Sequence, residues 1–203
     1  MPQWIRRNFE SQGMTQYPTG KHLRAVQDRM GGAVVLCLDV SGSMYAERLA
    51  QAVAGCERFI GEALGAFYQV EMLFWHHDIA GHTKLVRDKD QLMSFLQTAS
   101  SGGGNNIVPT LRHAEHVLEG LVGDRVVAIF GDGDLGDVGL ARRESERLVA
   151  KNIRIMTCGL GEASAQGLNT ISTEISDTPR TAHADTITQA IADMAAGLRR
   201  GSP

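Results

Sequence analysis

The sequence predicts an α/β protein with a doubly wound, mostly parallel six-stranded sheet, one antiparallel edge strand and helices on both faces. Short, continuously apolar runs alternate along the chain with longer segments in which apolar residues recur every three or four positions. The apolar runs are typical of strands buried on both faces of a parallel sheet, and the recurring pattern is typical of amphipathic helices. Because strands alternate with helices, we expect right-handed crossovers that cover both faces of one open sheet.

The strands are predicted from the apolar runs and from their spacing. The clearest runs cover residues 33–38, 70–75, 126–130 and 153–158. Residues 83–86 follow the second run too closely for a helical crossover, so they predict a hairpin return and the antiparallel edge of the sheet. A last strand is expected near 170–175 or 181–184, where the pattern is poor.

The helices are predicted from apolar stripes that lie between these runs. Strong stripes cover residues 49–67, 107–121 and 187–198, and weaker ones cover 90–98 and 140–150. Before the first strand, residues 1–32 have weak periodicity and a turn-prone composition, which predicts an N-terminal arm with a short helix over 21–30. Residues 33–200 then form one domain, a size that is ordinary for a single domain.

Composition excludes several classes of function. The chain of 203 residues carries 20 lysines and arginines against 23 aspartates and glutamates, a net charge of −3. Its longest basic runs are pairs, so we expect no nucleic-acid partner. No stretch approaches the ~20 apolar residues that span a bilayer, and the N-terminus lacks the apolar core of a secretory signal. The three cysteines have no close partner and predict reduced core thiols. We therefore expect a cytoplasmic protein without membrane contact.

Small and polar residues follow the predicted strands at one edge of the sheet, where open α/β sheets bind their ligands. They are Asp39, Ser41 and Ser43 after the first strand, Gly104, Asn105 and Asn106 before the stripe at 107–121, and Asp132 and Asp134 after the strand at 126–130. A carboxylate and two hydroxyls in one turn suit a hard divalent cation. Mg²⁺ usually keeps several waters, so an incomplete set of protein ligands is expected, with a position open to a carboxylate from a partner.

These segments together resemble the von Willebrand factor A domain family. Asp39-Val-Ser-Gly-Ser43 resembles the Asp-x-Ser-x-Ser motif that opens the family's metal-ion-dependent adhesion site. The segment 103–107, Gly-Gly-Asn-Asn-Ile, stands where the family has Gly-Gly-Thr before a helix, and Gly131-Asp132-Gly133 stands where it has Thr-Asp-Gly. The resemblance covers nearly all of the chain beyond the arm, with the three motifs in the family's order.

The resemblance implies a role for each matching residue. Ser41 and Ser43 would touch the metal directly, whereas Asp39 and Asp132 would often act through water. Asn105 stands where the family has a metal-ligating threonine. Its side-chain carbonyl is a good oxygen ligand, but it is longer and planar, so the affinity of the site for metal is expected to differ.

The function that the resemblance implies is binding and not catalysis. We expect a module that holds Mg²⁺, or Mn²⁺ or Ca²⁺, and uses it to bind an aspartate or glutamate of a protein partner. The rim that selects the partner is expected to include His77, Gly104, Asn106 and Asp134. Because we expect no secretory signal, no membrane-spanning segment and no disulfides, the chain resembles the bacterial intracellular members of the family. Those proteins often serve as adaptors in multiprotein systems. The expected partner is an AAA+ ATPase or another operon-encoded protein, in a metal-chelatase, stress or defence system.

Other functions remain as alternatives. Asp132 and Asp134 echo the Asp-x-Asp-x-Thr/Val pattern of haloacid-dehalogenase-type phosphatases, although Gly136 occupies the fifth position, so a metal-dependent phosphatase-like hydrolase is the alternative function. The same loop matches the dinucleotide fingerprint Gly-x-Gly-x-x-Gly. We reject that match because Asp132, Asp134 and Asp137 would repel a pyrophosphate.

Histidines offer a further possible metal site. His76, His77 and His82 flank the expected hairpin, and His113 and His116 lie one helical turn apart. Adjacent histidines on a strand point to opposite faces, so few of them can converge on one ion. We interpret both groups as solvated surface residues.

Overall fold

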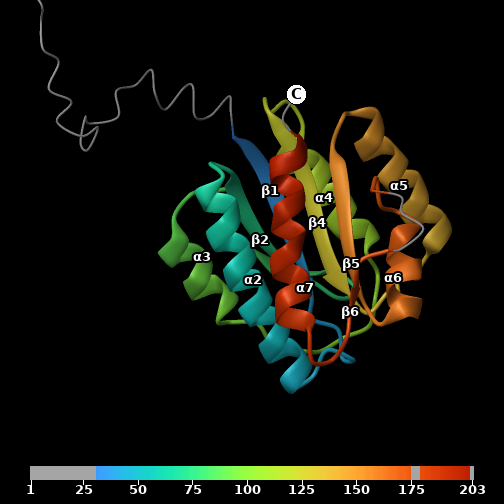
Figure 1. The fold of residues 1–203 in the computed structure, drawn as a ribbon. Coiled ribbons are helices and arrows are strands. Elements are labelled where there is room, and N and C mark those ends of the chain that lie inside the picture. The colour runs from blue at the N-terminus through green and yellow to red at the C-terminus, as the bar shows by residue number, and fades with distance from the viewer. Residues whose placement is uncertain (1–30, 175–178, 202–203) are drawn as a thin grey trace, which may run out of the picture.

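The computed structural model describes residues 31–174 and 179–201 (Figure 1). The expected short helix over 21–30, and with it nearly all of the expected arm, lies outside these residues. Within the described part, a single twisted sheet is covered by helices on both faces, as the alternation of apolar runs and stripes predicts.

The sheet has six strands in the order β3-β2-β1-β4-β5-β6. The strands are β1 (Gly32–Asp39), β2 (Gln69–Trp75), β3 (Ile79–His82), β4 (Asp124–Gly131), β5 (Arg154–Leu160) and β6 (Thr181–Ala182). All neighbouring pairs are parallel except β2 and β3, which form the antiparallel edge. The predicted fold class is therefore confirmed.

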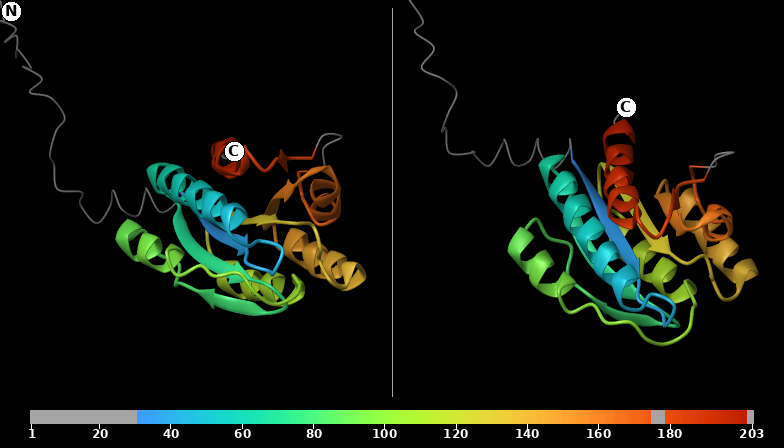
Figure 2. Two further views of the ribbon diagram at one scale, coloured as in Figure 1. Left: turned by 90° about the horizontal axis from the view of Figure 1, so that it is seen from below. Right: turned by 60° about the horizontal axis from the view of Figure 1, so that its bottom comes forward.

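Helices cover the sheet in two layers. They are α2 (Glu47–Gly65), α3 (Lys89–Leu96), α4 (Val108–Leu118), α5 (Val138–Ala150), α6 (Glu162–Asn169) and α7 (Ile187–Met194), which a 3₁₀ helix, η1 (Ala195–Gly201), continues. Viewed from below, α2 and α7 lie on one side of the sheet and α4 and α5 on the other (Figure 2). Among the described helices, none combines the length and the hydropathy that a membrane span needs.

Each face of the sheet has its own apolar core, because successive residues of a strand point to opposite faces. On β1, Val34, Leu36 and Leu38 pack with α2, α3 and α7, whereas Val35 and Cys37 pack with α4, α5 and α6. All of β1 is buried, which explains its continuous apolar run. The three cysteines are buried and free, as predicted.

The edge strand lies earlier than predicted. Residues 83–86 were expected to form the hairpin return, but β3 comprises Ile79–His82, and Val86 forms only an isolated bridge with Val70. Three residues suffice for the turn, which is closed by a hydrogen bond of 3.0 Å from the His76 N–H to the Asp78 carbonyl. An edge strand is paired on one side and partly solvated, so β3 has no apolar run that would reveal it.

The sequence did not predict helix α6. Only Ala165 and Leu168 of this helix are buried, which is too few for a visible stripe. Gly159 of β5 allows α6 to pack closely, because a Cβ atom there would lie 2.1 Å from the backbone nitrogen of Ala165. The last strand, β6, falls in the second of the two expected places.

Candidate metal centre

Two neighbouring parallel strands, β1 and β4, bring the polar loops together at one edge of the sheet. From β1 the chain crosses to β2 on one side, and β4 pairs with the other side of β1. The strand order reverses here, and in open α/β sheets this is where a crevice for ligands forms. The carboxyl ends of these strands lie at the bottom of Figure 1, which comes forward in the right-hand view of Figure 2.

Asp39 is the last residue of β1, and its buried carboxylate organises the two loops next to it. Its Oδ1 accepts a hydrogen bond of 2.7 Å from the Ser41 backbone N–H, and its Oδ2 accepts one of 3.1 Å from the Asp132 N–H. Gly131 leaves room for this carboxylate, because a Cβ atom there would lie 2.8 Å from Oδ2 of Asp39. The close approach of strand β4 to the Asp39 side chain therefore depends on a glycine.

Side-chain hydrogen bonds join the three loops through Asp132. The hydroxyl oxygens of Ser41 and Ser43 lie 3.0 Å apart, and the Ser43 hydroxyl donates to Oδ2 of Asp132. The amide Nδ2 of Asn105 donates to Oδ1 of Asp132 at 2.9 Å. The structure thus brings together all five residues that the sequence predicted as metal ligands. We call this connected set, Asp39, Ser41, Ser43, Asn105 and Asp132, the oxygen cluster.

Two carboxylates share the oxygen cluster, and no cationic side chain from residues 31–174 or 179–198 lies between them. The pKa of Asp39 is raised to about 6, by burial first and also by the charge of Asp132, against the lowering effect of the hydrogen bonds from Ser41 and Asp132. In the described part of the chain, the arginines and lysines that form ion pairs do so elsewhere, and Arg48 reaches only the carbonyl oxygen of Ser43, at 3.4 Å. Carboxylates and hydroxyls are donors that hard cations prefer, so this set fits a divalent ion that would supply the missing charge.

The glycine-rich loop before α4 closes one side of the oxygen cluster. Gly103 has a φ of +78°, and a Cβ atom there would lie 2.7 Å from Nδ1 of His77, so the loop passes this side chain only as glycine. A Cβ atom on Gly104 would also meet His77, at 4.0 Å. The side-chain oxygen of Asn106 accepts a hydrogen bond of 3.2 Å from the Val108 N–H at the start of α4. Three of the four predicted rim residues, His77, Gly104 and Asn106, thus lie in or beside this loop.

Asp134, the fourth predicted rim residue, is exposed in the turn after β4. Its Oδ1 accepts a hydrogen bond of 3.0 Å from the Gly136 N–H, and its own N–H donates to Oδ1 of Asp132 at 3.2 Å. The carboxylate of Asp134 therefore braces the turn that presents Asp132, and it does not join the oxygen cluster directly.

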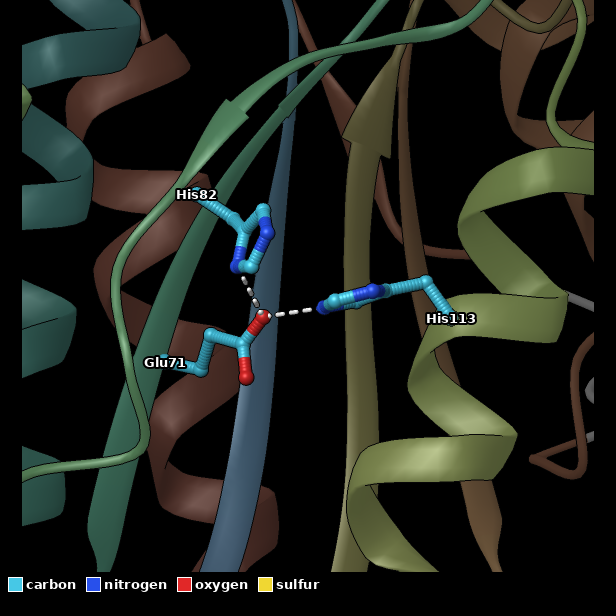
Figure 3. Close-up of side chains that lie close together, drawn as sticks. All are labelled: Glu71, His82 and His113. Carbon is cyan, nitrogen blue, oxygen red and sulfur yellow. Dashed lines mark hydrogen bonds and ion pairs between the residues drawn. The ribbon is translucent and has the colours of Figure 1, made fainter.

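A second polar cluster lies between the β2–β3 edge and α4 (Figure 3). We call it the histidine cluster; it comprises Glu71 of β2, His82 of β3 and His113 of α4. Oε1 of Glu71 lies 2.5 Å from Nε2 of His113 and 3.2 Å from Nδ1 of His82. The interpretation of these histidines as solvated surface residues is wrong for His113, whose side chain is 19% exposed, and incomplete for the half-exposed His82. His116, one turn further along α4, is exposed as expected.

One signal in the sequence pointed to the histidine cluster. Glu71 interrupts the apolar run at 70–75, and its side chain is 2% exposed. A carboxylate in a buried strand requires hydrogen-bond or charged partners, because burying it alone costs several kcal/mol. The sequence shows that such partners are needed but not which residues supply them.

Comparison with known protein families decides which family this fold represents. The family described as "VWA domain containing CoxE-like protein" matches residues 1–184. The chain belongs to this family. The resemblance to von Willebrand factor A domains, inferred from three short motifs, is thereby confirmed. Among curated protein sequences, none matches this VWA domain significantly.

Solved structures share the fold of this VWA domain at low sequence identity. The vWF domain of the type V pili tip protein Mfa5 from Porphyromonas gingivalis matches with a TM-score of 0.74 at 13% identity, over 85% of this chain and 96% of that one. The conserved hypothetical protein BatB from Bacteroides thetaiotaomicron matches with a TM-score of 0.65 at 17% identity, over 84% of this chain and 100% of that one. The manganese-loaded TRAP protein from Plasmodium vivax matches with a TM-score of 0.66 at 17% identity, over 80% of this chain and 72% of that one. At these identities the likeness establishes the fold alone.

Proposed function

We propose that this VWA domain binds a divalent cation, Mg²⁺ in the first place, and uses it to hold an aspartate or glutamate of a protein partner. One observation carries the proposal: the five residues of the oxygen cluster form a connected set in which two carboxylates meet, and no cationic side chain of the described residues pairs with them. A cation would stabilise the ionised form of Asp39, whose pKa is raised by burial first and also by the charge of Asp132.

The residues of the oxygen cluster would supply two kinds of ligand to the ion. Ser41 and Ser43 present neutral hydroxyl oxygens, and Asp39 and Asp132 supply negative charge directly or through water. Because two of these ligands are weak and uncharged, a bound Mg²⁺ keeps exchangeable waters, one of which the partner's carboxylate would replace. Mn²⁺ and Ca²⁺ accept the same oxygen donors.

The partner would be selected by the surface around the ion. His77, Gly104 and Asn106 lie on one side of it and Asp134 on another. Two structural relatives are described as pilus proteins, the tip protein Mfa5 and the adhesin SpaC from Lactobacillus rhamnosus GG, which supports a role in protein binding. For this domain we propose a cytoplasmic, bacterial setting, with an AAA+ ATPase or another operon-encoded protein as the partner.

The alternative, a phosphatase-like hydrolase that uses Asp132 and Asp134, has less support. In such an enzyme both carboxylates would face the substrate, but Asp134 accepts the Gly136 N–H within its own turn. Asp132 in turn accepts hydrogen bonds from Ser43 and Asn105. We therefore expect no release of phosphate from an aryl phosphate, with or without Mg²⁺.

Calorimetric titration of chelator-stripped protein with Mg²⁺ and with Mn²⁺ tests the proposal. We expect saturable binding at one site that is lost in Ser41→Ala. Ser94→Ala is the matched control, because Ser94 is exposed on α3 and its hydroxyl only donates to the Asp90 carbonyl. Absence of heat, together with an unchanged melting temperature, would contradict metal binding. Turnover of an aryl phosphate that is abolished by Asp132→Ala would instead establish the hydrolase.

A further inference from the structure

We propose that the histidine cluster is a second metal site, separate from the oxygen cluster and selective for a first-row transition cation, Zn²⁺ by its ligand set. Glu71, His82 and His113 each offer one ligand atom, and these atoms all lie within 4.8 Å of one another. The three side chains converge from β2, the edge strand β3 and helix α4 (Figure 3). The site would tie these three elements together.

The register of the edge hairpin places two of the ligands side by side. His82 pairs with Leu73, which is two residues beyond Glu71 on β2 and so points to the same face of the sheet. Diagonal neighbours of this kind lie about 7–8 Å apart at the backbone, within reach of long side chains. Nδ1 of His82 also lies 2.9 Å from the Thr83 carbonyl oxygen, a contact that a metal ion bound to this nitrogen would replace. Backbone pairing therefore sets the geometry before any ion arrives.

The charge of Glu71 gives a reason for a cation at this place. The side chain of Glu71 is 2% exposed, and its ion-pair partners among the described residues are the two histidines, which are charged only when protonated. Neutral imidazoles would leave a buried carboxylate with hydrogen bonds but no opposite charge, which is costly in a low-dielectric interior. A divalent ion bound between the three groups would balance that charge while both rings remain neutral.

The donor atoms indicate which cation the histidine cluster would take. Two imidazole nitrogens and one carboxylate oxygen are a common ligand set for zinc, which binds them at about 2.0–2.2 Å. Hard ions such as Mg²⁺ and Ca²⁺ prefer sites made of oxygen. With three protein ligands, a fourth position remains for water, and the side chain of His82, 44% exposed, leaves this side of the cluster open to solvent.

Titration of the full chain with Zn²⁺ in excess Mg²⁺, and with Co²⁺ as a spectroscopic substitute, tests this site. We expect one equivalent of Zn²⁺ to bind, and Co²⁺ to give the absorption of a low-coordinate nitrogen-ligated ion. His82→Gln and His113→Gln should each weaken binding by more than the roughly 10–100-fold that loss of an outer hydrogen-bond partner costs. The matched control is His116→Gln, because His116 is exposed on the same helix as His113.

Each outcome bears on the proposal. His82→Gln removes a half-exposed side chain, so it should disturb the core less than His113→Gln. If His113→Gln fails to fold, the metal affinity of His82→Gln decides the case, with its circular dichroism spectrum as the check that it is folded. Failure of both ions to bind, or equal affinity in wild type, His82→Gln and His113→Gln, would overturn the second site. Zn²⁺ binding that is lost only in Ser41→Ala would place the ion at the oxygen cluster and also overturn it. Because Ser41→Ala tests one cluster and the histidine variants test the other, failure here is distinguishable from failure of the proposed function.

Discussion

The two polar clusters of this VWA domain are built by opposite strategies. The oxygen cluster collects residues from loops that directly follow β1 and β4 or precede α4, so each ligand stands beside an element that the sequence reveals. The histidine cluster takes one residue each from β2, β3 and α4, with no motif around any of them. The comparison teaches that a short motif marks a site only when neighbouring residues supply several of its ligands.

The largest effect is expected from removing a carboxylate of the oxygen cluster. Asp132→Ala deletes a negative charge close to a divalent ion, which at an effective dielectric constant near 20 is worth about 4 kcal/mol or more. We therefore expect Mg²⁺ affinity to fall by roughly 1,000-fold, measured by calorimetry, while Zn²⁺ binding at the histidine cluster persists. Asp134→Ala is the control two residues away. It should keep most of the Mg²⁺ affinity but lower the affinity of the domain for its protein partner. Equal losses in both variants would show that the turn matters more than the charge.

A smaller effect is expected on stability in the absence of metal. The pKa of Asp39 is raised to about 6 in the folded chain, against 3.8 for an ordinary aspartate. The folded state therefore holds this proton to a higher pH than the unfolded state. The favourable contribution of protonated Asp39 is present below pH 4 and is lost as the pH rises through 6, about 3 kcal/mol in all.

Denaturant unfolding between pH 4 and pH 7, in chelator, measures this loss. Asp39→Asn should remove this part of the pH dependence and bind Mg²⁺ poorly, and it should lower stability at pH 4, because an amide nitrogen cannot accept either of the backbone N–H groups that the two carboxyl oxygens accept. Asp185→Asn is the control, because Asp185 is exposed. An Asp39→Asn protein that follows the wild-type pH profile would contradict the assignment to Asp39.

Restoring the residue expected from the family's motif should strengthen the oxygen cluster modestly. The side-chain amide of Asn105 donates a hydrogen bond to Oδ1 of Asp132. This hydrogen bond occupies an oxygen that could otherwise bind the metal. A threonine hydroxyl is shorter and would free that oxygen, so Asn105→Thr should raise Mg²⁺ affinity by about tenfold, or 1.4 kcal/mol. Reduced affinity would indicate that the domain uses the amide oxygen itself as a ligand.

The smallest expected effect is the coupling between the two clusters. Within the described residues, no hydrogen bond or ion pair links a member of one cluster to a member of the other. Sites without shared partners usually act independently within about 0.5 kcal/mol. Saturating Zn²⁺ should therefore change Mg²⁺ affinity by less than about threefold, and a larger change would show that α4 carries a signal between them.

Much of the fold and one of the clusters follow from local sequence, for physical reasons. The strand β1 is buried on both faces, so its apolar run is unambiguous, and topology alone then places Asp39 beside Asp132. The edge strand β3 was predicted four residues too late and helix α6 was not predicted, because partly exposed elements need few apolar residues. The predicted last helix also divides, with α7 ending at Met194 before a 3₁₀ turn.

The histidine cluster lay beyond sequence reasoning because it depends on two long-range alignments. The hairpin register decides that His82 lies diagonally from Glu71. The docking of α4 on the sheet decides that His113, and not the neighbouring His116, turns inward. The contact between Asn105 and Asp132 is of the same kind, since side-chain direction in a loop is set by what surrounds it.

The distance along the chain between Asp39 and Asp132 has a consequence for biosynthesis. These residues are 93 positions apart, and Asp132 directly follows β4, the strand that completes the centre of the sheet. A ribosome-bound chain that has released only the first loop presents Asp39, Ser41 and Ser43 without their partner carboxylate. Cation capture must then wait until β4 has emerged and inserted beside β1, so the ion can be held only by a chain that has already assembled its central strands.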